Sequence, residues 1–181
     1  MIIRLATLND IPQILAFVAE VIPGMKATGN FQWDYDYPNK QVFTEDINLN
    51  QLWVAEATGA IAGVAAITTD QDAEYAQAGL DIDEAAIVTH RLAVNINYRG
   101  RGVAAALLMQ AEHEAAQRGI NILRIDTNIA NLATQKLFPK LGYVLAGEIS
   151  LDIRPGLRFL CYEKRLNSNL QQLPGIANLF P

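Results

Sequence analysis

The stretch that decides the fold is HRLAVNINYRGRGVAAALL, which runs from His90 to Leu108. A strand-like apolar segment gives way to two arginines alternating with two glycines, Arg99 to Gly102, and then to an alanine-rich run typical of a helix. A glycine turn before a helix presents free backbone N–H groups and the positive helix end to an anion, and arginines can neutralise phosphate. We therefore predict a phosphate-bearing ligand at this turn. A solvated surface turn is the alternative for an isolated RGRG.

Two nucleotide-binding templates fit this turn poorly. The Gly-Lys-Ser/Thr ending of a P-loop is absent. Gly100-x-Gly102-x-x-Ala105 satisfies the dinucleotide fingerprint G-x-G-x-x-A, and Asp126 ends the next strand, where a ribose-binding acid would sit. In that fold, however, the first glycine directly follows the strand, whereas Asn95–Arg99 intervene here. A nucleotide oxidoreductase is therefore our third-ranked hypothesis.

The hydrophobic pattern around the turn predicts one mixed α/β domain spanning residues 1–166. Strands are expected at 2–5, 52–57, 60–69, 85–94, 122–126, 143–151 and 159–165, and helices at about 7–22, 40–49, 103–118 and 131–140. Residues 23–39 are expected to form a loop or broken helix, and 70–84 an acidic connection. The tail, 167–181, is expected to be disordered or docked on a partner subunit, so a homodimer is one option.

The overall composition excludes several classes of protein. The net charge of −5 argues against a nucleic-acid binder, which would carry a basic face. The single cysteine, Cys161, permits no internal disulfide, and the N-terminus lacks the features of a signal peptide. No apolar run reaches the ~18 residues that a membrane helix needs. We expect a cytoplasmic protein that does not bind membranes.

Residues Arg99–Ala104 read R-x-x-G-x-A, which resembles the acetyl-CoA-binding signature of the GNAT superfamily of N-acetyltransferases. RLAV before the turn resembles that family's fourth strand. DTNIANLATQKLFPKLGYV resembles its fifth strand, the following helix and a lysine-leucine-glycine-aromatic turn. The resemblance, which extends from Ile2 to about Leu166, implies the GNAT fold. In this α/β (α+β) fold, a mixed, mostly antiparallel, twisted sheet of six to seven strands carries about four helices and is splayed between strands four and five.

The resemblance also implies acetyl-CoA as cosubstrate and assigns residues to it. Backbone N–H groups of the turn would bind the pyrophosphate, the fourth strand would pair with the pantetheine amides, Asn131 would hydrogen-bond the pantetheine arm, and Phe138 would pack against it. Asn131 is alternatively a helix N-cap, with Asn128 as a competing cap. The expected cofactor-binding residues are Leu92, Ala93, Val94, Arg99, Gly100, Arg101, Gly102, Val103, Ala104, Asn131 and Phe138.

The catalytic base implied by the resemblance is His90. By strand alternation we place it on the same face as Leu92 and Val94, at an offset where some family members carry a catalytic His or Glu. A hydrogen-bonded core histidine is the alternative, and Glu84 is the second candidate base. Members of the family transfer the acetyl group directly to an amine, so Cys161 is expected to be a buried strand residue rather than a nucleophile.

The general acid is where the sequence departs from the family. Phe138 stands where many members carry a tyrosine, and phenylalanine has no proton to give. We expect Tyr162 to substitute, ahead of Tyr143, which is expected to be a packing residue; water is another option. A chain that binds CoA without efficient transfer, acting as a sensor or interaction module, is the alternative function.

The acceptor is expected opposite the cofactor, beside the aromatic and acidic segment Phe31–Pro38. Aromatic faces and carboxylates can hold a cationic amine, so Trp33, Asp34 and Tyr37 are the expected substrate-binding residues for a small-molecule or peptide amine. Trp33 and Tyr37 are alternatively anchors of an irregular loop. No His/Cys/Asp group shows metal-ligand spacing, and we predict no metal.

Overall fold

The structure is a computed structural model and describes residues 1–166. Its centre is one sheet of seven strands in the order β1-β2-β3-β4-β5-β7-β6. Every neighbouring pair is antiparallel except β4 and β5, which are parallel. The mixed, mostly antiparallel sheet is thereby confirmed. The strands are β1 (Ile2–Leu5), β2 (Leu52–Ala57), β3 (Ala60–Thr68), β4 (Ile87–Val94), β5 (Ile122–Asn128), β6 (Val144–Ile149) and β7 (Phe159–Arg165).

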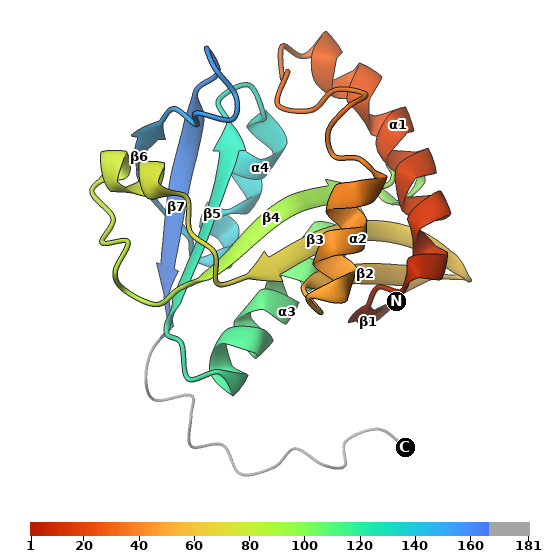
Figure 1. Cartoon of the computed structure of the whole chain (residues 1–181), viewed down its shortest axis with the longest axis horizontal. Helices are drawn as coiled ribbons and strands as arrows, with labels where there is room; N and C mark the ends of the chain where they lie inside the picture. The colour runs from red at the N-terminus through yellow and green to blue at the C-terminus, as the bar shows by residue number, and fades with distance from the viewer. Residues whose placement is uncertain (167–181) are drawn as a thin grey trace.

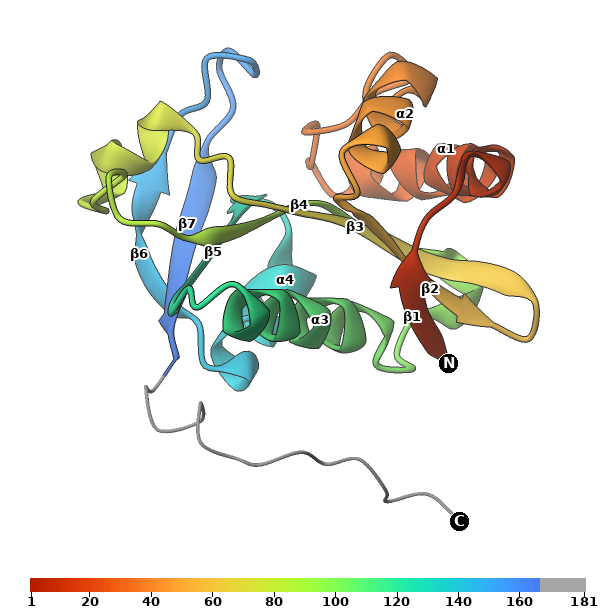
Figure 2. The same cartoon turned by 60° about the horizontal axis from the view of Figure 1, so that its bottom comes forward.

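Four α-helices cover the two faces of this sheet. Helices α1 (Ile11–Ala27) and α2 (Lys40–Asn48) lie on one face, and α3 (Val103–Gln117) and α4 (Leu132–Leu137) lie on the other (Figures 1 and 2). Each helix turns an apolar stripe toward the sheet, so that two main core layers form, one on each face. The order of helices and strands is the predicted one. Residues 167–181, for which either disorder or docking on a partner subunit was predicted, lie outside the described residues.

Helix α1 is longer than predicted. It continues through Pro23 and Gly24 to Ala27, where the sequence indicated a loop or broken helix. Proline within a helix removes one backbone hydrogen bond and disfavours the preceding turn. Burial of Val21 and Ile22, and packing of Met25 against the same core layer, offset that cost.

The sheet splits between β4 and β5. The two strands pair only from Ile87 to Thr89, opposite Leu123 to Ile125. Beyond Thr89, β4 follows β3 while β5 stays paired with β7 as far as Asn128. The predicted splay is thereby confirmed. Since the facing backbone groups beyond it have no partner strand, the opening can accept a ligand's amides.

A bulge in β4 overturns one prediction about His90. Arg91 has φ +54°, and two residues, Arg91 and Leu92, stand opposite Ala65 of β3 between the Val64–Ala93 and Ala66–His90 pairs. Such a bulge breaks the two-residue alternation of a strand. Leu92 and Val94 pack against the core layer under α3, whereas His90 faces the segment that contains Asp70 and Asp72. The predicted common face is therefore wrong.

The acidic connection after β3 contains a short 3-10 helix, Ala73–Ala78. It packs beside β6, and its fully buried Tyr75 joins a small core with Val88 and Cys161. This packing holds Asp72, just before the 3-10 helix, over the end of the β4–β5 pairing. Three further 3-10 helices span Leu8–Asp10, Ile96–Tyr98 and Pro139–Leu141. Within residues 1–166, no helix has the length and apolarity to cross a bilayer.

Candidate functional site

Two cavities meet where β4 and β5 diverge. The long groove has a volume of about 850 Å³ and runs along β4 and the start of α3. The small pocket, of about 90 Å³, lies between the splayed strands and the loops above them. The residues that line both cavities, and so lie between them, are Gln32, Trp33, Leu92, Asn131 and Thr134.

The glycine–arginine turn forms one end of the long groove. Gly100 and Gly102 have φ of +73° and +77°, a region that disfavours side chains. Gly102 is the N-cap of α3 and offers no capping side chain, so the first N–H groups of α3 stay available to an anion. The predicted cofactor-binding residues that line the groove are Leu92, Ala93, Val94, Arg99, Gly100, Gly102, Val103, Ala104 and Asn131.

Two predicted cofactor residues lie elsewhere. The guanidinium of Arg101 stacks over the Tyr98 ring, 5.5 Å from its centroid, and Arg101 does not line the groove. Arg101 is therefore removed from the groove wall, because its side chain packs along the turn. Phe138 is fully buried and lines the small pocket instead.

Asn131 is free to serve a ligand. It is the N-cap of α4, yet its side chain makes no capping bond or other hydrogen bond within residues 1–166. The neighbouring Asn128 instead accepts a hydrogen bond from Ala130 N–H at 2.9 Å. The structure therefore shows no capping hydrogen bond from the Asn131 side chain.

The opposite wall of the long groove was missed by the sequence reasoning. It comes from the last turns of α1 and the loop after it: Val21, Gly24, Met25, Thr28 and Asn30. The sequence indicated a loop or broken helix here, and only the continuation of α1 through Pro23 brings these residues to the groove.

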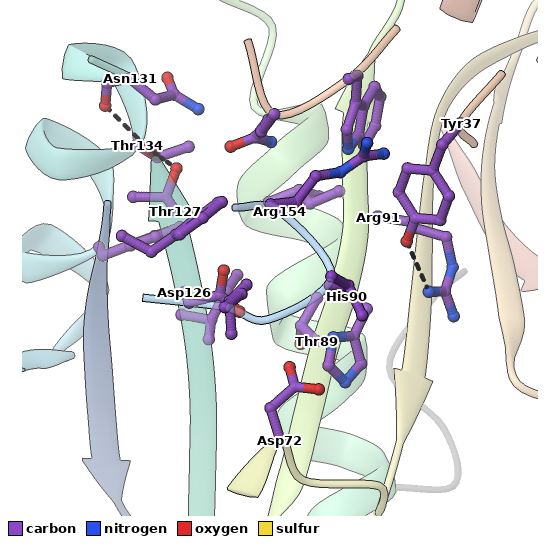
Figure 3. A pocket seen from close by; sticks show the side chains of 18 residues that line it. Tyr37, Asp72, Thr89, His90, Arg91, Asp126, Thr127, Asn131, Thr134 and Arg154 are labelled. Atoms are coloured by element: carbon purple, nitrogen blue, oxygen red, sulfur yellow. Dashed lines mark hydrogen bonds between the residues drawn. The ribbon is translucent and has the colours of Figure 1, made fainter. Parts of the chain in front are cut away.

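Three titratable groups gather at the lower end of the small pocket (Figure 3). One carboxylate oxygen of Asp72, one ring nitrogen of His90 and one carboxylate oxygen of Asp126 all lie within 4.8 Å of one another. Tyr75 donates its hydroxyl proton to Asp126 Oδ1 at 2.9 Å, which orients that carboxylate. His90 Nε2 lies 3.1 Å from the carbonyl oxygen of Asp70, and since a carbonyl only accepts, this nitrogen carries the proton.

Burial changes the chemistry of the two carboxyls. Desolvation raises the pKa of Asp126, and it raises the pKa of Asp72 as well. A carboxyl whose pKa is raised toward neutrality is better suited to exchange a proton with an amine. The three groups come from separate segments and have no motif spacing. A divalent cation could use the same atoms, and the absence of a metal stays a prediction.

Arginine and tyrosine side chains form the other side of the small pocket (Figure 3). Arg91 donates two hydrogen bonds of 2.7 Å to Asp46 and one of 3.3 Å to the hydroxyl of Tyr37. Arg154, from the loop between β6 and β7, stacks on the Tyr37 ring with its guanidinium carbon 4.6 Å from the centroid. The pocket thus has an acidic end and a cationic side.

The aromatic segment is only partly as predicted. Trp33 and Tyr37 line the small pocket, and both pack against the core as the alternative of loop anchors predicts, so their contact with a substrate stays a prediction. Asp34 does not line the pocket: its carboxylate accepts from Asp36 N–H, Tyr37 N–H and Arg154. The prediction of direct substrate contact by Asp34 is therefore wrong, because that carboxylate holds the loop together.

The second candidate base and the two candidate acids lie away from the cavities. Glu84 binds Arg165 at 2.6 Å, which lowers the pKa of Glu84, and it lines neither cavity. Tyr162 packs edge-on against Phe138, with ring centroids 5.2 Å apart, and Tyr143 is buried in the same core layer. Neither tyrosine lines a cavity, so the structure offers no support for Tyr162 as the acid.

Comparison with known proteins identifies the family. A model of the acetyltransferase (GNAT) family matches residues 24–143. The chain belongs to this family. An acetyltransferase of the GNAT family from Streptococcus agalactiae is 30% identical, with a TM-score of 0.74 over 92% of this chain and 95% of the other. The seven-stranded mixed fold of this GNAT acetyltransferase is thus that of solved relatives.

Two further relatives are more distant. The N-acetylaspartate synthetase of Xenopus tropicalis is 25% identical over 113 residues, which are 62% of this chain and 38% of the relative. The yncA protein of Salmonella typhimurium, solved with its cofactor acetyl-CoA, is 16% identical with a TM-score of 0.66, covering 98% of this chain and 99% of the other. At that identity the second likeness concerns the fold alone.

Proposed function

We propose that this GNAT acetyltransferase transfers the acetyl group of acetyl-CoA to a primary amine by direct attack. The observation that carries the proposal is that the two cavities adjoin at the β4–β5 splay, where they share lining residues. The long groove leads from the anion-binding turn at Arg99–Ala104 to Asn131, and the small pocket continues from there to the acidic end. One ligand can therefore enter from each side and meet the other at the splay.

The long groove fits acetyl-CoA in its chemistry. The start of α3 supplies uncapped N–H groups for a pyrophosphate, and the unpaired side of β4 beyond Thr89 supplies backbone partners for amides. Asn131 has free polar atoms along the same path. The bound molecule would supply the acetyl thioester, and these residues would bind and orient it. The yncA protein, which shares this fold, was solved with acetyl-CoA as its cofactor.

The small pocket fits the amine. Asp72 and Asp126 attract an ammonium group, and His90 or Asp126 takes its proton, directly or through water. This keeps His90 as the predicted base and adds Asp126 as its partner. An amine acceptor also agrees with the name of the N-acetylaspartate synthetase, although this chain spans only 38% of that protein.

The departing thiolate must take its proton from a group other than residue 138. Thr89 lines the small pocket, is buried, and its hydroxyl has no hydrogen-bond partner among residues 1–166. We include Thr89 in the proposal as a hydrogen-bond donor that stabilises the departing thiolate, and the thiolate takes its proton from water. Phe138 still favours the second candidate function, a CoA-binding sensor that transfers poorly.

The first experiment is calorimetric titration with acetyl-CoA and with NADH. Saturable binding of acetyl-CoA alone is expected, whereas binding of NADH instead would favour the dinucleotide alternative. The matched variants are Gly102→Val and Gly119→Val, because both glycines have positive φ and open space around a Cβ, but only Gly102 lies in the groove. Gly102→Val should raise the Kd for acetyl-CoA at least about tenfold, the loss of one charge-assisted hydrogen bond or more. Gly119→Val should leave the Kd unchanged.

The second experiment follows thiol release from acetyl-CoA with a panel of primary amines. Turnover with any amine supports the enzyme. Tight binding of acetyl-CoA without thiol release across the panel would support the sensor. Equal Kd values for both glycine variants would remove the turn from the site.

A further inference from the structure

We infer that the acceptor is a small amino acid-like molecule whose carboxylate is bound by Arg154 while its amine faces Asp72 and Asp126. This inference rests on the proposed function, and it names the class of acceptor that the small pocket takes. It is carried by the position and the incomplete pairing of the Arg154 guanidinium.

Arg154 is held in the small pocket from two sides. Its guanidinium stacks on the Tyr37 ring, and Nη1 donates to Asp34 Oδ2 at 3.3 Å. Its side chain is only 20% exposed, although it comes from a surface loop. Figure 3 shows the side chain reaching across the pocket between Thr127 and Tyr37. Stacking and the ion pair fix the plane of the guanidinium, as expected of a binding group rather than a solvated arginine.

The pairing of this guanidinium is incomplete. An arginine has five N–H donors, and within residues 1–166 Arg154 makes the single hydrogen bond to Asp34. Arg91, on the same side of the pocket, is better matched by comparison, with two short bonds to Asp46 and one to Tyr37. Arg154 lines the small pocket with these donors left over for a ligand, and a carboxylate matches the forked geometry of arginine.

Tyr37 offers a second donor at the same place. Its hydroxyl oxygen accepts a hydrogen bond from Arg91 Nη1 at 3.3 Å, so its own proton is left for another acceptor. Because the Tyr37 ring lies against Arg154, a carboxylate on the guanidinium would lie beside this tyrosine. The acids that attract the amine lie at the other end of the same pocket (Figure 3). Opposite charges within one small pocket match a zwitterion.

A purely structural role for Arg154 is the competing explanation. The arginine would then only tie the β6–β7 loop to the segment around Asp34, and its removal would affect all acceptors equally. A carboxylate-binding role predicts discrimination between acceptors that differ in that one group. The test therefore compares matched acceptors.

The acceptors are three pairs with the same side chain, with and without the carboxylate: leucine and 3-methylbutylamine, phenylalanine and 2-phenylethylamine, methionine and 3-(methylthio)propylamine. Each L-amino acid is also supplied as its carboxamide, and an alanine-rich peptide represents peptide N-termini. Thiol release from acetyl-CoA gives kcat and KM for each. We expect at least one L-amino acid to exceed its decarboxylated amine and its carboxamide in kcat/KM at least about tenfold, since a charged hydrogen-bonded pair is lost.

The variants separate the binding role from the structural one. Arg154→Gln should raise KM for the L-amino acid at least about tenfold, with little change in kcat and in KM for the decarboxylated amine. Arg154→Lys keeps the charge but loses the forked guanidinium, so its KM for the L-amino acid should lie between those of the wild type and Arg154→Gln. The control is Arg158→Gln in the same hairpin, where an arginine with a 56% exposed side chain pairs with Glu148 outside the pocket. It should match the wild type.

The two possible failures are distinct. Equal turnover of amines with and without a carboxylate, preference for the peptide, or an equal KM change for all acceptors in Arg154→Gln would overturn the amino-acid inference and leave N-acetyl transfer standing. Absence of thiol release with every acceptor, despite binding of acetyl-CoA, would overturn the proposed function and the inference with it.

Discussion

At the scale of single residues, the acidic end of the small pocket depends on a carboxylate that the fold makes costly to ionise. Asp126 stands in strand β5 between the buried residues Ile125 and Thr127, and burial raises its pKa. One hydrogen bond from Tyr75 compensates only part of the lost hydration. Because desolvation disfavours the ionised carboxylate, Asp126 is suited to accept a proton. The same desolvation lowers the stability of the fold, which can be measured.

We predict that Asp126→Asn lowers kcat about 10²-fold while it raises the melting temperature at neutral pH. Because the folded-state pKa is raised, the folded protein keeps a proton that the unfolded chain loses just above pH ~3.9. Wild-type stability therefore falls as the pH rises from there through the folded-state pKa, and the deficit is complete above it. Asn cannot ionise, and its Oδ1 can still accept from Tyr75.

Thermal unfolding between pH 3.5 and 8 checks this prediction. The stability gain of Asp126→Asn should be present at pH 7 and vanish toward the acid end of the range. The exposed Asp83 provides the control, because Asp83→Asn should change neither rate nor stability measurably. A melting temperature below that of the wild type at pH 7, or an unchanged kcat, would contradict the assignment of Asp126.

At the scale of helices and strands, one glycine sets how closely α3 approaches the sheet. A Cβ on Gly63 of β3 would lie 2.6 Å from Val103 Cγ1 and 2.9 Å from the carbonyl oxygen of Ala93. Both neighbours line the long groove: Val103 begins α3 and Ala93 belongs to β4. The position of the anion-binding turn relative to β4 therefore depends on the absence of a side chain at residue 63.

We predict that Gly63→Ala destabilises the fold by about 1–3 kcal/mol and weakens acetyl-CoA binding, because α3 or β4 must move to admit the methyl group. The control is Gly59→Ala at the β2–β3 turn, where φ is +77° and a Cβ meets open space. That change should cost about 1–2 kcal/mol in backbone strain and leave the affinity unchanged. Denaturant unfolding and calorimetry measure the two quantities. Equal affinities in both variants would show that the groove does not depend on this spacing.

Local pattern was enough to predict the order of the helices and strands and the glycine–arginine turn before α3. Consecutive residues form the turn and the start of α3, so glycine positions and helix periodicity were enough to predict them. The bulge at Arg91 could not be found in this way. A non-glycine residue with positive φ is held there by its ion pair with Asp46 of α2, a contact between distant segments. The predicted face of His90 failed for this reason.

The acidic cluster could not be predicted from the sequence for a similar reason. Asp72, His90 and Asp126 come from a 3-10 helix boundary and two different strands, and only the packing of Tyr75 brings the first to the others. Cys161 and Tyr162 are neighbours on β7 and belong to different core clusters, and the sequence does not say which of them meets the pocket. In the structure Tyr162 packs with Phe138 in the core layer that also contains residues of α3.

At the scale of the whole molecule, the splayed sheet separates the two ligands and lets them meet at one opening. The long groove and the small pocket approach that opening from different sides, so both ligands can be bound at the same time. The fold thus favours a ternary complex over an acetylated enzyme. The one cysteine supports this, since Cys161 is fully buried and burial raises the pKa of its thiol to about 12. At neutral pH it carries almost no thiolate, the form that reacts.

We therefore predict sequential kinetics, with intersecting double-reciprocal lines when acetyl-CoA and the amine are varied. Cys161→Ala should keep kcat within about twofold, because the thiol is outside the reaction path. It should lose about 1 kcal/mol or more of stability through the cavity that it leaves beside Tyr75 and Val88. Parallel lines, together with an acetylated Cys161 detected by mass spectrometry after incubation with acetyl-CoA alone, would contradict direct transfer. An acetylated enzyme would also require the core around Tyr75 to open during each turnover, which hydrogen exchange of β7 would detect.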